Sequence, residues 1–307
     1  MIRSYIRAFD LFFFAYLFLV SLLTSLYREA IPLSANILLK NAIMFLVVSL
    51  FIRYGENSQN ALLRFCRFWY LCAGIPILFA ELSYLIHIVR PVDYDPFLIK
   101  LDLFIFGVHP TVWLERFVHP LLTDILQVFY VLYLPLPLPL GFLLYCGKKE
   151  EEFYTFTTAI SMLFFLSLLG YLAVPAIGPR YTLVSYQHIP LYGMWCADEL
   201  MALLNQVEGL NRDCFPSGHA AMAVMVWIES YLRGRKLFPL YLVMGTGVFI
   251  GTVYLRYHYV VDLPAGIILG VFCSVASRRL VPWWESTIRR QSNPRLLGPM
   301  PAVKSQY

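Results

Sequence analysis

Long apolar runs alternate with short polar segments along the whole chain. A helix needs about 20 mostly apolar residues to cross the hydrocarbon core of a bilayer. Eight runs approach that length, roughly at residues 9–27, 33–52, 68–89, 121–145, 154–175, 217–233, 237–257 and 259–277. The first is long for the core of a signal peptide, so we expect it to remain in the protein as a span. The pattern predicts an all-α, polytopic membrane helix bundle with about eight transmembrane helices.

This pattern also sets the expected domain organisation. Residues 1–279 hold all the apolar runs and are expected to form a single transmembrane domain. Residues 280–307 contain Pro, Ser and Arg and are expected to form a cytoplasmic tail.

Two segments interrupt the regular alternation. The fourth run contains LPLPLPL at residues 134–140, and prolines this close together break helical hydrogen bonding. Within lipid such a break is tolerated only where neighbouring groups or a cavity satisfy the backbone. Between the third and fourth runs, Asp95–Pro96 is typical of a helix N-cap followed by a first-turn proline. The mixed apolar and charged residues after it predict a helix lying in the membrane interface.

Composition supports a membrane protein and excludes several other classes. Hydrophobic residues make up 59% of the chain and charged residues only 14%, against about 25% charged in a typical soluble domain. The net charge of +5 is modest and dispersed, which argues against a nucleic-acid partner. The six cysteines include no C-x-x-C pair, so a zinc or thioredoxin-type site is not expected.

The distribution of basic residues predicts the orientation. With the N-terminus inside, 16 of the 24 Lys and Arg residues fall on the cytoplasmic side, 7 fall outside, and Lys40 lies within a span. Short cytoplasmic loops are enriched in Lys and Arg, and RGRK at residues 233–236 fits this rule well. The sequence therefore predicts that the segments preceding residue 217 and joining the last two spans face away from the cytoplasm.

Three segments at that outer face carry the candidate chemistry: AIGPRYTL, CFPSGHAAMAV and YLRYHYVVDL. Ionisable residues at the membrane edge are costly to keep and are usually functional. The candidates are Arg180, Ser217, Gly218, His219, Arg256, His258 and Asp262.

These residue types suit the transfer of a phosphate group. Ser217 and Gly218 stand where a helix is expected to begin, and free backbone N–H groups at a helix N-terminus bind anions. Arg180 and Arg256 offer a planar fork that matches phosphate oxygens, although either side chain can instead simply reach the interface. One histidine can attack phosphorus while a second protonates the leaving alkoxide. A carboxylate four residues after His258 can fix its tautomer.

The motifs P-S-G-H and H-x3-D, with an upstream G-P-R, resemble the type 2 phosphatidic acid phosphatase superfamily of membrane lipid phosphatases and phosphotransferases. The resemblance covers roughly residues 170–275, and DPFLIKLDLFIFG with RYHYVVD is similar to the inositol phosphorylceramide synthase branch. It implies a six-helix catalytic core, with the additional spans N-terminal. It also implies the role of each matching residue: His258 as the nucleophile, Asp262 as its orienting acid, His219 as the general acid, and Ser217, Gly218 and Arg180 as phosphate ligands.

The chain departs from the family pattern at two cationic positions. Ala173 stands where the first motif has a lysine, and Gly251–Thr252 stands where the third motif has Ser-Arg. Arg256, two residues before His258, is the expected replacement for that arginine. The tyrosines around His258 are interpreted as part of an aromatic belt at the interface.

The resemblance implies a two-step displacement through phosphohistidine, with no metal or other cofactor. The first hypothesis is a lipid phosphatase, in which water resolves the intermediate. The second is a lipid headgroup phosphotransferase, and the third is a catalytically weak binding or transport protein that keeps the fold. The expected substrate is a phospholipid or an isoprenoid phosphate within the membrane.

Two further pairs of residues are considered. Lys40 and Glu81 lie at similar depth in the second and third expected spans, so an ion pair inside the bundle is expected. The alternative is that Lys40 supplies the missing cation. Cys196 and Cys214 are the two cysteines placed outside, where a disulfide is possible, and two free thiols are the alternative.

Overall fold

The computed structural model describes residues 6–208 and 212–292, and within these ranges all regular structure is helical. The helices are α1 (Ala8–Leu26), α2 (Ser34–Gly55), α3 (Ala61–Trp69), α4 (Leu71–Ala80), α5 (Leu82–Val89), α6 (Asp95–Phe106), α7 (Pro110–Trp113), η2 (Leu114–Phe117), α8 (Pro120–Val131), α9 (Leu138–Cys146), α10 (Glu150–Ala173), α11 (Pro179–Thr182), η3 (Val184–Tyr186), α12 (Ala197–Glu208), α13 (Gly218–Arg233), α14 (Phe238–Tyr254) and α15 (Asp262–Ser292). The predicted all-α membrane bundle is confirmed, and helices cover each of the eight expected ranges.

The expected spans differ from the helices in their continuity. Among the described residues, four helices are long and apolar enough to cross a membrane, namely α1, α2, α10 and α15, and up to six spans result if each bent pair counts as one. One bent pair is α3 with α4, at 40°, and the other is α6 with α7 and η2, at 60°. The segment from Asp95, expected to lie in the interface, therefore also qualifies as a broken span or a re-entrant loop. Helices α13 and α14 have 16 and 17 residues and fall just short of the length required.

The proline-rich segment breaks the fourth expected span. Helix α8 ends at Val131 and α9 starts at Leu138, with turns between them. The N–H of Leu140, in the first turn of α9, donates to the hydroxyl of Tyr241 at 3.0 Å, so a neighbouring helix satisfies a group that the break leaves free. This is the compensation that a break within lipid requires.

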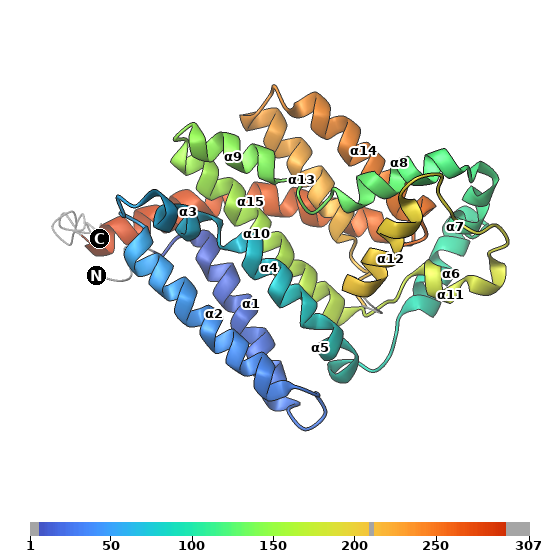
Figure 1. Cartoon of the computed structure of the whole chain (residues 1–307), viewed down its shortest axis with the longest axis horizontal. Coiled ribbons are helices and arrows are strands. Elements are labelled where there is room, and N and C mark those ends of the chain that lie inside the picture. Colours follow the sequence, from blue (N-terminus) through green and yellow to red (C-terminus); the bar gives the residue numbers. More distant parts are fainter. Residues whose placement is uncertain (1–5, 209–211, 293–307) are drawn as a thin grey trace, which may run out of the picture.

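Helix α13 lies at the centre of the bundle, packed against α14 and α15, while α10 packs against α1, α13 and α15 (Figure 1). Close approach of α13 and α15 depends on small residues. A Cβ on Gly266 would lie 2.4 Å from the Ser217 carbonyl oxygen, and one on Gly270 would lie 2.3 Å from that of Ala221. The two helices that begin at Gly218 and Asp262 are thus held nearly in backbone contact.

Buried charges within the bundle are paired. Lys40 and Glu81 form the expected ion pair at 2.8 Å, so the amine of Lys40 is engaged in the bundle. Near the other end of α2, Arg67 is fully buried and lies 2.8 Å from Asp10 and 2.9 Å from Glu56. Pairing of this kind is what makes a charge tolerable away from water.

The last helix extends beyond the expected end of the transmembrane domain. Helix α15 continues to Ser292, and in this extension Trp284 donates to the carbonyl of Ile6 at 2.9 Å while Glu285 pairs with Arg7 at 2.6 Å. Residues 280–288 therefore pack with the bundle, and the expected tail stays a prediction, with residues 293–307 outside the described part of the chain. The described ends of the chain lie together, and α6, α7, α11 and α12 gather at the opposite end of the molecule (Figure 1).

Candidate active site

The two motif histidines meet at the end of the bundle where α13 begins. His219 occupies the first turn of α13, and His258 lies in the short connection between α14 and α15. His258 Nε2 is 3.4 Å from His219 Nδ1. The sequence analysis expected them to share one face, and the fold brings their rings together although 39 residues separate them.

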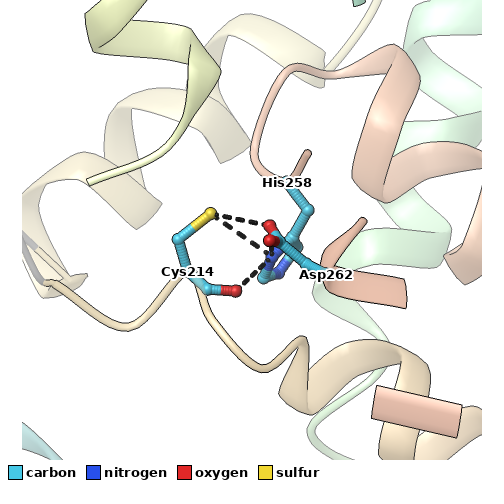
Figure 2. Close-up of side chains that lie close together, drawn as sticks. All are labelled: Cys214, His258 and Asp262. Atoms are coloured by element: carbon cyan, nitrogen blue, oxygen red, sulfur yellow. Dashed lines mark hydrogen bonds and ion pairs between the residues drawn. The ribbon is translucent and has the colours of Figure 1, made fainter. Parts of the chain in front are cut away.

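Two residues, Cys214 and Asp262, surround the Nδ1 side of His258 (Figure 2). Its Nδ1 lies 2.8 Å from the backbone oxygen of Cys214 and 3.4 Å from Asp262 Oδ2. A carbonyl oxygen only accepts hydrogen bonds, so Nδ1 carries the proton in the neutral ring. The lone pair of His258 is then on Nε2, which faces His219. This is the tautomer that a nitrogen nucleophile requires.

Cys214 contacts the same group through its side chain. Its thiol donates to Asp262 Oδ2 at 3.0 Å, and that oxygen also accepts the N–H of Tyr259 at 2.8 Å. Burial, together with the nearby carboxylates, raises the pKa of the Cys214 thiol well above its usual range, so the thiol keeps its proton. The donors of Cys214, His258 and Asp262 lie within 4.8 Å of one another and have the chemistry to hold a metal ion. In this structure the three residues form a hydrogen-bonded group.

The sequence left open either a disulfide between Cys196 and Cys214 or two free thiols. Cys196 and Cys214 are both free thiols. Cys196 stands just before α12, whose start is held by Asp124, whereas Cys214 points toward Asp262. The Cys214 thiol donates to Asp262, whereas Cys196 is held through its backbone N–H by Asp124.

The start of α13 has the form of an anion site. Ser217 is the N-cap, and its Oγ accepts the N–H of Ala220 at 3.2 Å. Neither the N–H of Gly218 nor that of His219 has an acceptor among the described residues. A Cβ on Gly218 would lie 2.9 Å from the hydroxyl of Tyr171, so only glycine leaves this approach open. Phosphate binding by Ser217 and Gly218 stays a prediction. Because the Ser217 hydroxyl already accepts the N–H of Ala220, we expect the free backbone N–H groups to contribute more to phosphate binding than this hydroxyl.

The two candidate arginines have different surroundings. Arg180, in α11, donates to the hydroxyl of Tyr257 at 3.0 Å. Arg256 is 6% exposed, and its guanidinium lies 2.9 Å from Glu115 and 3.1 Å from the side-chain oxygen of Gln187. The predicted role of Arg256 in phosphate binding stays a prediction, and its charge is already neutralised by a carboxylate.

A cavity of about 140 Å³ opens beside the histidines. Its walls come from α4, α8, the proline-rich break, α10 and the outer loops. Among the described residues that line it there is no lysine or arginine, and Arg180 reaches its edge through Tyr257. Asp213 also lines the cavity, and the sequence analysis gave it no role because it belongs to no motif.

Aromatic rings fix one wall of this cavity. Tyr130 stacks on His219 with ring centroids 4.1 Å apart and on Tyr257 at the same distance, and Tyr133 lies 3.9 Å from His219. The sequence analysis interpreted the tyrosines near His258 as part of an interfacial belt, and the structure shows that Tyr257 also lines this cavity. Tyr259 is buried and donates to Asp95 at 2.8 Å.

Two carboxylates of α6 hold the loops that carry the motifs. Asp95 accepts the N–H groups of Ile177 and Gly178 at 2.9 and 2.8 Å, and Asp102 accepts those of Val260 and Val261 at 3.0 Å each. Asp95 was expected to act as an N-cap, but it is the first helical residue and its side chain points to the loop before α11. The sequence gave no signal for these contacts, since the partners are backbone groups distant along the chain.

The geometry agrees with what comparison with known proteins shows. A family model described as PAP2 superfamily matches residues 96–276, which is more than half of the chain. The chain belongs to the PAP2 superfamily. The match begins within α6, so the anchoring helix and the histidine motifs fall inside the PAP2 region, and α1 to α5 precede it.

Two curated relatives extend the comparison. The chain is 25% identical over 162 residues to a phosphoinositol dihydroceramide synthase of Bacteroides thetaiotaomicron, covering 48% of this chain and 52% of that protein. It is 33% identical over 110 residues to a PA-phosphatase related-family protein of Dictyostelium discoideum, covering 33% of this chain and 19% of that protein. The chain thus spans about half the length of the first relative and less of the second. No solved structure matches.

Proposed function

We propose that this protein is a membrane-embedded enzyme that breaks a phosphate-ester bond of a lipid through a phosphohistidine on His258. The observation that carries the proposal is the orientation of the two rings, with the unprotonated Nε2 of His258 facing His219. Membership of the PAP2 superfamily supports the reaction class.

The reaction balances with the residues present. His258 Nε2 attacks phosphorus and the ester P–O bond breaks, while His219 gives a proton to the leaving alkoxide. Water then attacks phosphorus, the P–N bond breaks, and His219 takes the proton back. In this proposal the N–H groups at the start of α13 and Arg180 stabilise the charge on the phosphate oxygens.

Water is the acceptor in the first candidate function, a lipid phosphate phosphatase. The second candidate is a lipid headgroup phosphotransferase, in which an alcohol takes the place of water. The name of the Bacteroides relative favours this second candidate. In both cases phosphate binding relies on backbone N–H groups and arginine, so we propose that no metal is required.

A panel of lipid phosphates, given to purified protein in EDTA with and without alcohol acceptors, tests these proposals. Release of free phosphate supports the phosphatase, and a new phosphodiester formed only with an alcohol supports the transferase. Loss of turnover in EDTA that Mg²⁺ restores would contradict metal independence. Saturable binding without turnover would instead support a binding protein that keeps the fold.

The proposed active site is on the extracytoplasmic face. The basic RGRK turn lies at the far end of α13 from His219, which supports this orientation under the positive-inside rule. The substrate would then come from the outer leaflet.

A further inference from the structure

A second, apolar cavity adjoins the cavity beside the histidines. It has a volume of about 320 Å³ and lies between α4, the proline-rich break, α9 and α10. Helices α9 and α10 lie side by side in Figure 1. The two cavities share four wall residues, Ile75, Pro76, Leu134 and Phe164. The apolar groove therefore adjoins the space beside His219 and His258 across these four residues.

The proline-rich segment forms one side of this groove. Leu134, Pro135, Pro137 and Leu138 line it, and all four belong to the segment in which α8 has ended or α9 is just beginning. A continuous helix would fill this region with its backbone and side chains. The break removes that turn of helix and leaves a recess.

The opposite side is one face of α10. Phe153, Phe156, Ile160 and Phe164 line the groove at helical spacing, from near the start of α10 to its middle. Eleven residues separate the first from the last, which corresponds to about 16 Å along the helix. The groove thus runs from the histidines toward the membrane interior, in the direction that the chain of a lipid takes when its headgroup is at the surface.

We infer that this groove holds a hydrocarbon chain of the lipid phosphate while its phosphate lies at the histidines. The inference rests on the proposed function. A chain in the bilayer is already in an apolar solvent, so the groove gains little from the hydrophobic effect and acts through packing. It would orient the phosphate against His258 Nε2 and make turnover depend on the length of the chain.

Gly141 offers a way to fill the groove without breaking the fold. It lines the groove, and a Cβ there would lie 3.4 Å from Trp69 and 3.5 Å from Phe156, both ordinary contacts. Gly141→Leu should therefore occupy the chain site. Leu143→Phe is the matched control, because Leu143 lies on the same helix and its side chain is exposed.

Turnover of hexadecyl phosphate and butyl phosphate, which differ only in chain length, tests the inference in detergent. We expect Gly141→Leu to lower kcat/KM for hexadecyl phosphate by at least about tenfold and to leave that for butyl phosphate unchanged. Leu143→Phe should change neither. Equal losses on both substrates, or no loss on either, would overturn the inference.

Protection of Cys72 gives a measurement that does not need activity. Cys72 is exposed and lines the groove. In His258→Ala protein whose Cys66, Cys146 and Cys196 are replaced by Ser, hexadecylphosphonate should slow maleimide labelling of Cys72 and butylphosphonate should not. Equal labelling rates with both ligands would contradict the groove. If the wild type turns over neither phosphate, the phosphatase candidate fails, and Cys72 protection alone decides whether the groove binds a chain.

Discussion

The two histidines differ in what holds them. His258 is buried and is fixed through Nδ1 by the Cys214 carbonyl and Asp262, whereas His219 is held by stacking on Tyr130, and its Nε2 has no hydrogen-bond partner among the described residues. A ring fixed at one nitrogen presents the other as a nucleophile, and an unpartnered ring nitrogen is available to a substrate oxygen.

Replacement of each histidine should therefore have a different result. His258→Ala should abolish turnover and remove acid-labile, base-stable phosphate labelling of the protein. His219→Ala should slow turnover by about 100-fold to 10,000-fold, with substrate still bound, because general acid catalysis contributes that much. His188→Ala, which removes an exposed side chain of the outer loops, is the control. Labelling that persists without His258 would assign the nucleophile elsewhere.

Cys214 is expected to position Asp262 rather than to react. Cys214→Ala removes the thiol hydrogen bond to Oδ2 and should lower kcat/KM about tenfold, while Cys214→Ser restores a donor and most of the activity. Cys196→Ala should have no effect. Equal losses in Cys196→Ala and Cys214→Ala would indicate a disulfide between them and contradict the positioning role.

At the scale of elements, α6 connects the outer loops to the ends of α13 and α15. Its two carboxylates accept four loop N–H groups, and these loops carry Arg180, His258 and Asp262. The helix touches no reacting group in this arrangement, but it sets where the motif residues stand.

Asp102→Asn should disturb the site from a distance. Both carboxylate oxygens accept a backbone N–H, and an amide has only one oxygen, so one N–H of Val260 or Val261 would face an NH₂ group. We expect a loss of about 1–3 kcal/mol in stability, seen as a lower Tm in detergent, together with a lower kcat. Lys100→Ala, on the exposed side of α6, should change neither. An unchanged Tm and an unchanged kcat in Asp102→Asn would contradict the role of α6 in positioning the motif residues.

For the whole molecule, the arrangement in Figure 1 separates the candidate active site from the two described ends of the chain. The turn after α13 and the described ends carry several basic residues, and the loops around α11 lie at the opposite end. Under the positive-inside rule this arrangement supports the proposal that the histidines face the extracytoplasmic side.

Single cysteines test this orientation in a background lacking the native cysteines. A cysteine replacing the exposed Arg235 should resist an impermeant thiol reagent in intact cells, and one replacing the exposed Ser185 should react. Ser185 is preferred to Gln187, whose amide contacts Pro179 and Arg256. The reverse pattern would move the active site to the cytoplasmic leaflet.

Local patterns in the sequence predicted the helices and the membrane class, and they singled out His219, His258 and Asp262 as candidates that the fold brings together. The length of an apolar run and the spacing within P-S-G-H and H-x3-D depend only on short segments of sequence. They can therefore be recognised without knowing how the segments pack. The Lys40–Glu81 pair was also predictable, because depth along a span is set by helical rise.

Tertiary structure decided how those segments meet and which groups are left free. It directed Cys214 to Asp262 instead of Cys196, engaged Arg256 with Glu115, placed Tyr130 against His219 and used Asp102 to hold a distant loop. It also turned the proline-rich break into the wall of a groove that adjoins the histidines. Each of these depends on contacts between residues far apart in the chain, and a partner chosen by packing has no signature in the local order of residues.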